Sequence, residues 1–442
     1  MMNTKKLNLF LRANCKKSNL KRIKTISLLL LSLSIAACND NASIKTKQEK
    51  PPENITKIEK EPIKPDKKNN LNPAQKAWLK KVKLGPYASE TQDWEEIEAA
   101  AKKEGKVVIY SVSSRIFKIQ EKFQDKYGIE IIAYDTPSDI QLEKLRRDRK
   151  QNIFQVDVLF NNDIADINQE FLPHNLIWNF VPDTVADDLN ENEKNPVLVQ
   201  RWTSRIFIYN NQQYPDGPPI DNIWDLTRPE WEGKFVLPDP IGTTTEANAI
   251  ETILQHHQEM AAAYEAEFGE KLTISPELRQ IMQKNPLLGE PNAGTEWLYR
   301  LIKNKPVLTQ SGTRASDEVG YFKEPLGMTS FSKIRWVNQG KYQWQPLYNL
   351  KPIVGVAYPT TLTIADRAPH PNAAKLLIRF MMEEGFEPWN VTGDYAARQS
   401  IMEKQVKNSN IPKFDDLNIW SVDPEYIYEN KYTYITLYRL LQ

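Results

Sequence analysis

The chain has 442 residues, enough for two or more domains of ordinary size. Its 58 Lys and Arg residues balance its 57 Asp and Glu residues, so that the formal net charge is +1. A balance this close to neutral gives no support for nucleic-acid binding or for a polybasic membrane-binding surface.

The first forty residues have the pattern of an export signal. Basic residues, among them Lys16 and Arg22, precede an apolar segment over 26–35 that is too short to span a bilayer. The segment runs into Ala-Ala-Cys38, an order that resembles the bacterial lipobox, in which the cysteine is lipidated and becomes the new N-terminus. We therefore expect residues 1–37 to be a lipoprotein signal peptide and the lipid on Cys38 to hold the protein at the periplasmic face of a membrane. The alternative is an ordinary signal peptide with a chance cysteine.

Residues 38–70 have the composition of a solvated, disordered tether. Lysine, glutamate and proline dominate the segment, and its large apolar residues are scattered isoleucines. The other cysteine, Cys15, lies in the predicted signal peptide. The mature chain therefore has no internal disulfide in this interpretation, and its hydrophobic core must supply its stability.

The folded part begins with alternating helices and strands. A capping pattern at Asp93 starts a helix that ends at Gly105, and apolar strands are predicted over 106–110, 129–134 and 156–160, with helices over 116–127 and 138–149 between them; a further strand is predicted over 205–210. Alternation at this spacing predicts a parallel sheet covered on both faces. Ligands of such sheets bind at the carboxyl ends of the strands.

Four stretches carry, in order, a resemblance to a known family. The longest covers residues 223–240 and contains Ile-Trp-Asp-Leu-Thr-Arg-Pro-Glu-Trp-Glu-Gly-Lys-Phe followed by Leu-Pro-Asp-Pro. The other three cover residues 99–111, 297–312 and 352–382. Together they resemble the extracellular solute-binding proteins of ABC importers, in the branch that includes ferric-ion binders and their relatives for organophosphates.

The resemblance implies a periplasmic-binding-protein-like α/β fold, type II-like, with two α/β lobes and a ligand cleft at the hinge. We expect residues 71–209 and 356–390 to form the first lobe and residues 210–355 and 391–442 to form the second. Such a protein closes its lobes around a ligand. The implied partners are a small anionic ligand and an ABC permease of the inner membrane, and we expect a monomer without catalytic residues, cofactor or metal.

Polar loops near the predicted strand ends supply the candidate ligand contacts. Hydroxyl groups, helix N-termini and arginine side chains suit anionic oxygens. The candidates are Ser113, Ser114, Arg115, Asp135, Asn162, Arg201, Thr243, Thr244, Thr245, Ser311, Gly312, Thr313 and Arg314. Ordinary helix capping competes with this interpretation, because Thr243 and Glu246 have the spacing of a capping box. Tyr358, Thr360 and Thr361 lie near the expected return crossing and are hinge candidates.

The presence or absence of adjacent tyrosines distinguishes a ferric-ion ligand from an organophosphate ligand. The resemblance implies that a ferric ion is bound by phenolate and carboxylate oxygens, typically with two adjacent tyrosines. This chain has no Tyr-Tyr pair, and residues 327–331 contain no tyrosine. We therefore favour a phosphorylated sugar or another organophosphate. A ferric-iron-binding transport protein and a ligand sensor for a membrane kinase stay open as alternatives.

An envelope glycan-processing enzyme is a third class. We find no Gly-x-Ser-x-Gly elbow, phosphate-binding loop or zinc-type spacing in the sequence, and paired carboxylates cannot be identified from sequence separation. The tail after residue 408 is rich in tyrosine. The alternate spacing of Tyr426 with Tyr428 and of Tyr432 with Tyr434 predicts short strands or an aromatic lid on the second lobe. For these aromatic side chains we favour plain packing over a carbohydrate-stacking role.

Overall fold

The computed structural model describes residues 71–321, 324–409 and 411–442. They belong to one compact unit. The predicted signal peptide over 1–37, the predicted lipidation site Cys38 and the predicted tether up to residue 70 lie outside the described residues. None of the helices in the described ranges is long and apolar enough to cross a membrane.

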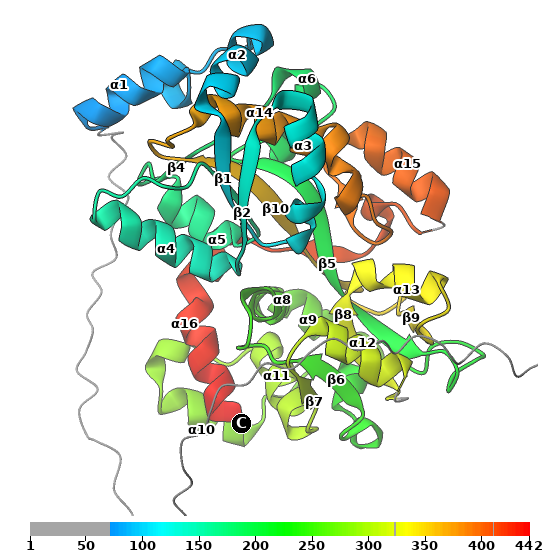
Figure 1. The fold of residues 1–442 in the computed structure, drawn as a ribbon. Helices are drawn as coiled ribbons and strands as arrows, with labels where there is room; N and C mark the ends of the chain where they lie inside the picture. Colours follow the sequence, from blue (N-terminus) through cyan, green and yellow to red (C-terminus); the bar gives the residue numbers. More distant parts are fainter. Residues whose placement is uncertain (1–70, 322–323, 410) are drawn as a thin grey trace, which may run out of the picture. The chain divides into compact units, whose positions relative to one another are not determined.

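A mixed sheet organises this unit (Figure 1). Its first three strands are parallel, as predicted from the sequence, and β6 is parallel to both β7 and β8. Along the sheet the strand order is β2 (Glu130–Asp135), β1 (Lys106–Ser111), β3 (Val158–Asn161), β10 (Gly355–Ala365), β5 (Leu198–Asn210), β8 (Leu326–Ser330), β6 (Phe235–Pro238) and β7 (Val307–Thr309).

Two long antiparallel strands, β5 and β10, connect the two parallel groups. The end of β10 pairs with β3, while the end of β5 pairs with β8 and with β9 (Trp344–Pro346). The change of partner occurs at Arg205, which lies opposite both Val356 of β10 and Ser330 of β8. A Cβ atom on Gly355 would lie 2.1 Å from the carbonyl oxygen of Arg205, so only glycine allows the two strands to approach this closely here. The lobe boundaries stay a prediction.

Helices α2 (Trp94–Glu104), α3 (Gln120–Tyr127) and α14 (Pro371–Met382) cover the β1–β3 group, and α4 (Ser138–Lys150) connects β2 to β3. The prediction for α2 is confirmed, because the Asp93 side chain accepts a hydrogen bond from the backbone N–H of Glu96 and Gly105 ends the helix at a φ of 73°. The helix predicted over 116–127 is wrong in its first part, where a 3₁₀ turn over Ser114–Lys118 precedes α3.

Around the β6–β8 group lie α8 (Thr244–Gln255), α9 (His257–Phe268), α11 (Ala293–Lys303) and α12 (Gly312–Gly320), and several of them enclose a core that contains the fully buried Trp224 and Trp297. The remaining elements are short or peripheral: α1 (Pro73–Val82), α5 (Ile164–Asp166), α6 (Asp183–Ala186), α7 (Glu191–Lys194), α10 (Pro276–Gln283), α13 (Ile334–Asn338), α15 (Gln399–Ser409), β4 (Ile177–Trp178), β11 (Tyr395–Ala396) and β12 (Ile419–Ser421).

The tyrosine-rich tail is a helix, α16 (Pro424–Leu441), so the prediction of short strands was wrong. The buried residues Ile427, Tyr434, Leu437 and Tyr438 recur at helical spacing, which outweighs the alternation of the other tyrosines. Helix α16 packs on α8 and α11 and also on α5 (Figure 1). It thus contacts helices that are associated with both groups of strands.

Candidate functional site

A cavity of about 400 Å³ opens where β1, β2 and β3 end. Six of the candidate residues from the sequence line it: Ser113, Ser114, Arg115, Asp135, Asn162 and Arg201. The other lining residues are Val112, Thr203, Ser330, Ser332, Arg335, Tyr358, Thr360 and Asp394. The wall therefore combines strand-end loops of the first sheet group with the end of β8 and with the two long strands.

The strand-end loops are held by local hydrogen bonds. The Ser111 hydroxyl donates to the carbonyl oxygen of Ser113 at 2.8 Å, and the indole N–H of Trp389 donates to the Ser113 hydroxyl at 3.1 Å. Asn162 accepts a hydrogen bond from the Ser138 hydroxyl at 2.6 Å. These bonds fix the backbone that carries the exposed Ser114 and the partly exposed Arg115 at the cavity wall.

A buried group of opposite charges forms the cavity floor. Arg201 is 7% exposed and Asp394 is 3% exposed. Oδ2 of Asp394 lies 3.3 Å from Nη1 of Arg115 and 3.8 Å from Nε of Arg201. Burial lowers the pKa of Arg201 to about 10, against the raising effect of Asp394, and the Arg115 charge lowers it further. The arginine is thus held in a site where its positive charge is incompletely compensated.

Several polar atoms of this floor have no hydrogen-bond partner in the described part of the chain. They are Nε of Arg201, Oδ1 of Asp394 and the hydroxyl groups of Thr203 and Thr360. Three of these four groups can donate a hydrogen bond, and all four belong to residues that line the cavity. Because a buried polar group without a partner is costly, a ligand or water that entered the cavity and paired with these atoms would be stabilised by them.

Positive charge also surrounds the cavity on the side of β8. Nη1 of Arg335 donates to the carbonyl oxygen of Ser332 at 2.6 Å. Burial and the Arg115 charge both lower the pKa of Arg335. The nearby Lys333 has its pKa lowered to about 8 by burial and by the charges of Arg335, Arg205 and Arg115. The cations repel one another across the cavity, and an anion placed between them would relieve that repulsion.

Tyr358 is oriented by a buried ion pair. Arg205 donates from Nη1 to the Tyr358 hydroxyl and from Nε to Oε1 of Glu246, each at 2.7 Å, and from Nη2 to the Thr245 hydroxyl at 3.0 Å. Burial is the main cause that raises the pKa of Tyr358 to about 12. The capping box predicted at Thr243 is wrong, because its hydroxyl donates to the Glu246 carboxylate and accepts no backbone N–H bond. Thr245 does not line the cavity and is connected to the lining residue Tyr358 through Arg205.

The remaining candidates do not line this cavity. Thr243 and Thr244 lie at the start of α8. The Ser311 side chain caps α12 by accepting from the backbone N–H of Arg314 at 3.2 Å, and the Arg314 side chain forms an ion pair with Glu318 at 2.7 Å. The carbonyl oxygen of Gly312 accepts a hydrogen bond from the Thr329 hydroxyl, next to the cavity residue Ser330, and Thr313 is exposed. Ligand contact by these residues stays a prediction.

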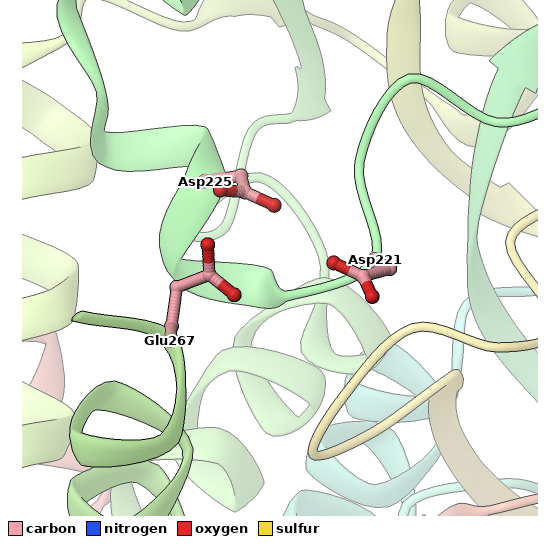
Figure 2. A group of neighbouring side chains, drawn as sticks. All are labelled: Asp221, Asp225 and Glu267. Atoms are coloured by element: carbon pink, nitrogen blue, oxygen red, sulfur yellow. The ribbon is translucent and has the colours of Figure 1, made fainter. Parts of the chain in front are cut away.

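A cluster of carboxylates lies away from this cavity. Oxygen atoms of Asp221, Asp225 and Glu267 lie within 4.8 Å of one another (Figure 2). Arg228 donates from Nε to Asp225 at 2.6 Å and from Nη2 to Glu267. A guanidinium group therefore compensates the negative charge of this cluster.

The larger cavity, of about 820 Å³, contains none of the candidate residues from the sequence. Lys81, Asp93, Trp178 and Asp183 are among its lining, on the side of α1 and α2. The Asp183 carboxylate already accepts hydrogen bonds from the Trp94 indole and from the backbone of Gln92. Size alone therefore does not identify the ligand site.

The chain shares its fold with solved transport proteins. Iron-bound HitA from Pseudomonas aeruginosa aligns with a TM-score of 0.57 at 16% identity over 76% of this chain and 99% of HitA. The apo ferric ion-binding protein A of Pasteurella haemolytica gives 0.54 at 13% identity, with 76% and 98% covered. AfuA from Actinobacillus pleuropneumoniae, with fructose-6-phosphate bound, gives 0.51 at 14% identity, with 76% and 97% covered. This chain has a periplasmic-binding-protein fold. Scans of the sequence against family models and curated proteins found no match.

Within the binding-protein fold, sequence reasoning missed Thr203, Ser330, Ser332, Arg335 and Asp394 as residues of the cavity wall. Ser330 lies in the segment 327–331, which the sequence indicated as a ligand-binding region of the ferric-ion binders. The Ser330 hydroxyl was not predicted to contribute to the cavity. Gly393, before Asp394, has a φ of 88°, and a Cβ atom there would lie 2.4 Å from the carbonyl oxygen of Phe331. A Gly-Asp pair is the only local pattern that points to this loop, and such pairs are common in turns.

Proposed function

We propose that this chain is the substrate-binding protein of an ABC importer and captures a small anionic solute, with a phosphorylated sugar or another organophosphate favoured. The fold neighbours support the class, since they include an ABC transporter protein from Clostridium perfringens and the periplasmic binding protein AfuA. In this proposal a monomer, anchored by lipid on Cys38 at the periplasmic face of a membrane, delivers its ligand to an inner-membrane permease. It performs no catalysis.

The observation that carries the ligand class is the excess of donors in the cavity. Arg115, Arg201 and Arg335 line it, and buried donors of Arg201, Thr203 and Thr360 lack partners in the described structure. Oxyanions are recognised by such groups, because guanidinium donors match their oxygen atoms in geometry and charge. Binding an oxyanion would pair these donors and compensate the repelling cations.

The ferric-ion alternative has support from HitA, whose solved structure contains bound iron. In the present chain, Tyr358 is the one tyrosine among the residues that line the described cavity. Its hydroxyl accepts a hydrogen bond from Arg205, and its pKa is raised to about 12. An iron-binding tyrosine must lose its proton, so the environment of Tyr358 favours the oxyanion. A sensor for a membrane kinase would use the same cavity and differs only in its protein partner.

Thermal unfolding of the purified protein tests this proposal. The panel contains fructose 6-phosphate, phosphate, phosphonates, simple carboxylates and ferric citrate. A ligand that binds only the folded state at about 100 times its dissociation constant stabilises it by about 2.7 kcal/mol, which raises the midpoint by several degrees. We expect a shift with an organophosphate. A shift with iron alone would replace the oxyanion by the ferric ion, and silence across the panel would refute the proposal.

A further inference from the structure

Asp394 is a buried acceptor in a cavity lined mainly by donors. One oxygen, Oδ2, faces Arg115 at 3.3 Å and Arg201 at 3.8 Å. The other oxygen, Oδ1, has no hydrogen-bond partner among the described residues, although the residue is 3% exposed. One carboxylate oxygen therefore faces the arginines of the protein, and the other is available to accept a hydrogen bond from a ligand.

The loop around Asp394 is fixed, so this side chain cannot simply turn to solvent. Asp394 directly precedes β11, whose Ala396 lies opposite Arg201 in β5. The close approach of Gly393 to Phe331 packs the same loop against the end of β8. The backbone N–H of Asp394 donates to the carbonyl oxygen of Val391 at 3.1 Å. Strand pairing on one side and backbone packing on the other thus hold the carboxylate at the cavity floor.

The cavity leaves both kinds of hydrogen-bonding group unsatisfied. The hydroxyl groups of Thr203 and Thr360 and Nε of Arg201 are unpartnered, and none of them forms a hydrogen bond with Oδ1 of Asp394. An occupant that satisfies the whole floor must accept hydrogen bonds from these donors and also donate one to Asp394. A fully ionised oxyanion without a hydrogen atom would place its oxygen against this carboxylate and be repelled.

We propose that Asp394 is a specificity residue that selects oxyanions carrying a hydroxyl group, O–H, beside the charged oxygens. This inference rests on the proposed function. A ligand ammonium group is a poorer donor here because Arg115, Arg201 and Arg335 line the same cavity and repel it. The ligand class is therefore a hydroxylated phosphomonoester. The O–H group comes either from a sugar hydroxyl or from a singly protonated phosphate, which exists below the second phosphate pKa of about 6.

Matched ligands test the inference on the unmodified protein. Methyl phosphate at pH 5 and methyl sulfate carry the same charge and nearly the same shape, but only the phosphate bears an O–H group. Glucose 6-phosphate and glucose 6-sulfate add sugar hydroxyls to each. Isothermal titration calorimetry should show at least about 100-fold weaker binding of methyl sulfate than of the best O–H-bearing ligand, because a site built for a hydroxyl rejects an analogue that lacks it.

The same measurement distinguishes a sugar hydroxyl from a protonated phosphate as the source of the O–H group. Binding of methyl phosphate that weakens between pH 5 and pH 8 assigns the donor to the protonated phosphate. Tight, pH-independent binding of glucose 6-sulfate assigns it to the sugar. Methyl sulfate that binds as tightly as methyl phosphate and glucose 6-phosphate would overturn the inference while leaving the proposed function standing. No binding by any phosphate ester refutes the proposed function itself, and the inference with it.

Asp394→Asn, with Asp125→Asn as its control, tests the residue. Asp125 is exposed on α3 and does not line the cavity. We expect Asp394→Asn to reduce the preference for O–H-bearing ligands from about 100-fold to a few-fold, since an amide pairs with acceptors and donors alike. Asp125→Asn should keep the preference. An equal loss for all ligands in Asp394→Asn would mean that Asp394 only orients Arg115, and would overturn the inference. If the circular dichroism spectrum of Asp394→Asn differs from that of the parent, the variant is misfolded, and the ligand comparison on the unmodified protein tests the inference instead.

Discussion

The cavity floor and the interface between α8 and α16 each bury a carboxylate with an unpartnered oxygen. The two carboxylates differ in the cations and the open space around them. At the floor, Asp394 lies beside Arg115 and Arg201 and borders an open cavity. In the helix interface, Glu251 is 1% exposed and neither of its oxygens has a partner among the described residues. Burial raises the pKa of Glu251 to about 8, against the lowering effect of Lys431, and nearby Asp163 raises it further.

The difference shows how an unpartnered buried group can be assigned to structure or to ligand binding. Glu251 can reduce the cost of burial by taking up a proton, because no arginine of the described residues forms an ion pair with it. Asp394 has its charge compensated by arginines, and the cavity beside it has room for a molecule. Compensating cations together with adjacent space, and not the missing hydrogen bond alone, therefore mark a ligand site.

The largest effect is expected for Arg201→Met. Methionine keeps much of the volume but removes a buried cation whose Nε has no hydrogen-bond partner in the described structure. Truncating one partner of a buried, charged hydrogen bond costs about 4 kcal/mol, so affinity for the anionic ligand should fall about 1,000-fold in calorimetric titration. Arg279→Met, at an exposed position of α10, is the matched control and should bind normally. Undiminished affinity in Arg201→Met would show that the residues of the cavity floor do not bind the ligand.

Glu251→Gln should change how stability depends on pH. A carboxyl group whose pKa is raised from 4.5 to about 8 on folding binds a proton in the folded state that the unfolded chain releases. The stability that this group contributes is fully present below about pH 4.5 and is lost as the pH rises to about 8, because the unfolded chain ionises over this range while the folded carboxyl group stays mostly protonated. Glutamine stays neutral, so the variant should equal the parent at pH 4.5 and exceed its unfolding free energy by about 4 kcal/mol at pH 8.5 in urea unfolding.

Two observations would contradict this prediction for Glu251. One is an equal pH dependence for the parent and for Glu251→Gln, and the other is a loss of stability in the variant at pH 8.5. Glu259→Gln, at an exposed position of α9, is the control, and its stability should follow the parent at every pH. Ligand affinity should be unchanged in Glu251→Gln, because the interface and the cavity are different sites in this comparison.

The strands that could be predicted from sequence are those that bury apolar side chains on both faces. Strands β1 and β3 have this character, whereas the edge strand β2 buries Ile131 fully and Ile132 only in part. Each of the three precedes an amphipathic helix or a polar loop. Strand β5 starts at Leu198, well before the predicted start at 205, because Gln200, Arg201, Thr203 and Ser204 make its first half look like a loop. Arg201 and Thr203 line the cavity, so polar residues of the proposed ligand site made this strand hard to predict from the sequence.

The site could be predicted only in part for a similar reason. Ser113, Asp135 and Asn162 follow parallel strands, and the rule that ligands bind at such strand ends is local. Arg335 and Asp394 reach the cavity through long-range packing, after the β8 segment and the loop before β11 fold against the long strands. The same local rule also selected Ser311, whose side chain is used to cap a helix. Helix capping and ligand binding use the same residue types at the same kind of position.

A smaller effect on binding is expected for Tyr358→Phe. The Tyr358 oxygen accepts from Arg205, so its own proton is directed elsewhere, and the residue lines the cavity. Removing this donor, and leaving Nη1 of Arg205 without its acceptor, should weaken ligand binding about 10-fold and lower the unfolding free energy by about 1 kcal/mol. Calorimetry and urea unfolding measure the two effects. Unchanged affinity would show that Tyr358 is part of the hinge and does not contact the ligand.

The smallest effect is expected for the corresponding change in the interface, Tyr434→Phe. The Tyr434 hydroxyl is buried against α8 and has no partner among the described residues, and burial raises its pKa. Removing a buried polar atom that lacks a hydrogen bond should leave the unfolding free energy unchanged or raise it by up to about 1 kcal/mol, with ligand affinity unaffected. A loss of more than about 1 kcal/mol in urea unfolding would mean that water satisfies this hydroxyl. The interface would then resemble the cavity in its polar groups, and the compensating arginines alone would distinguish the two regions.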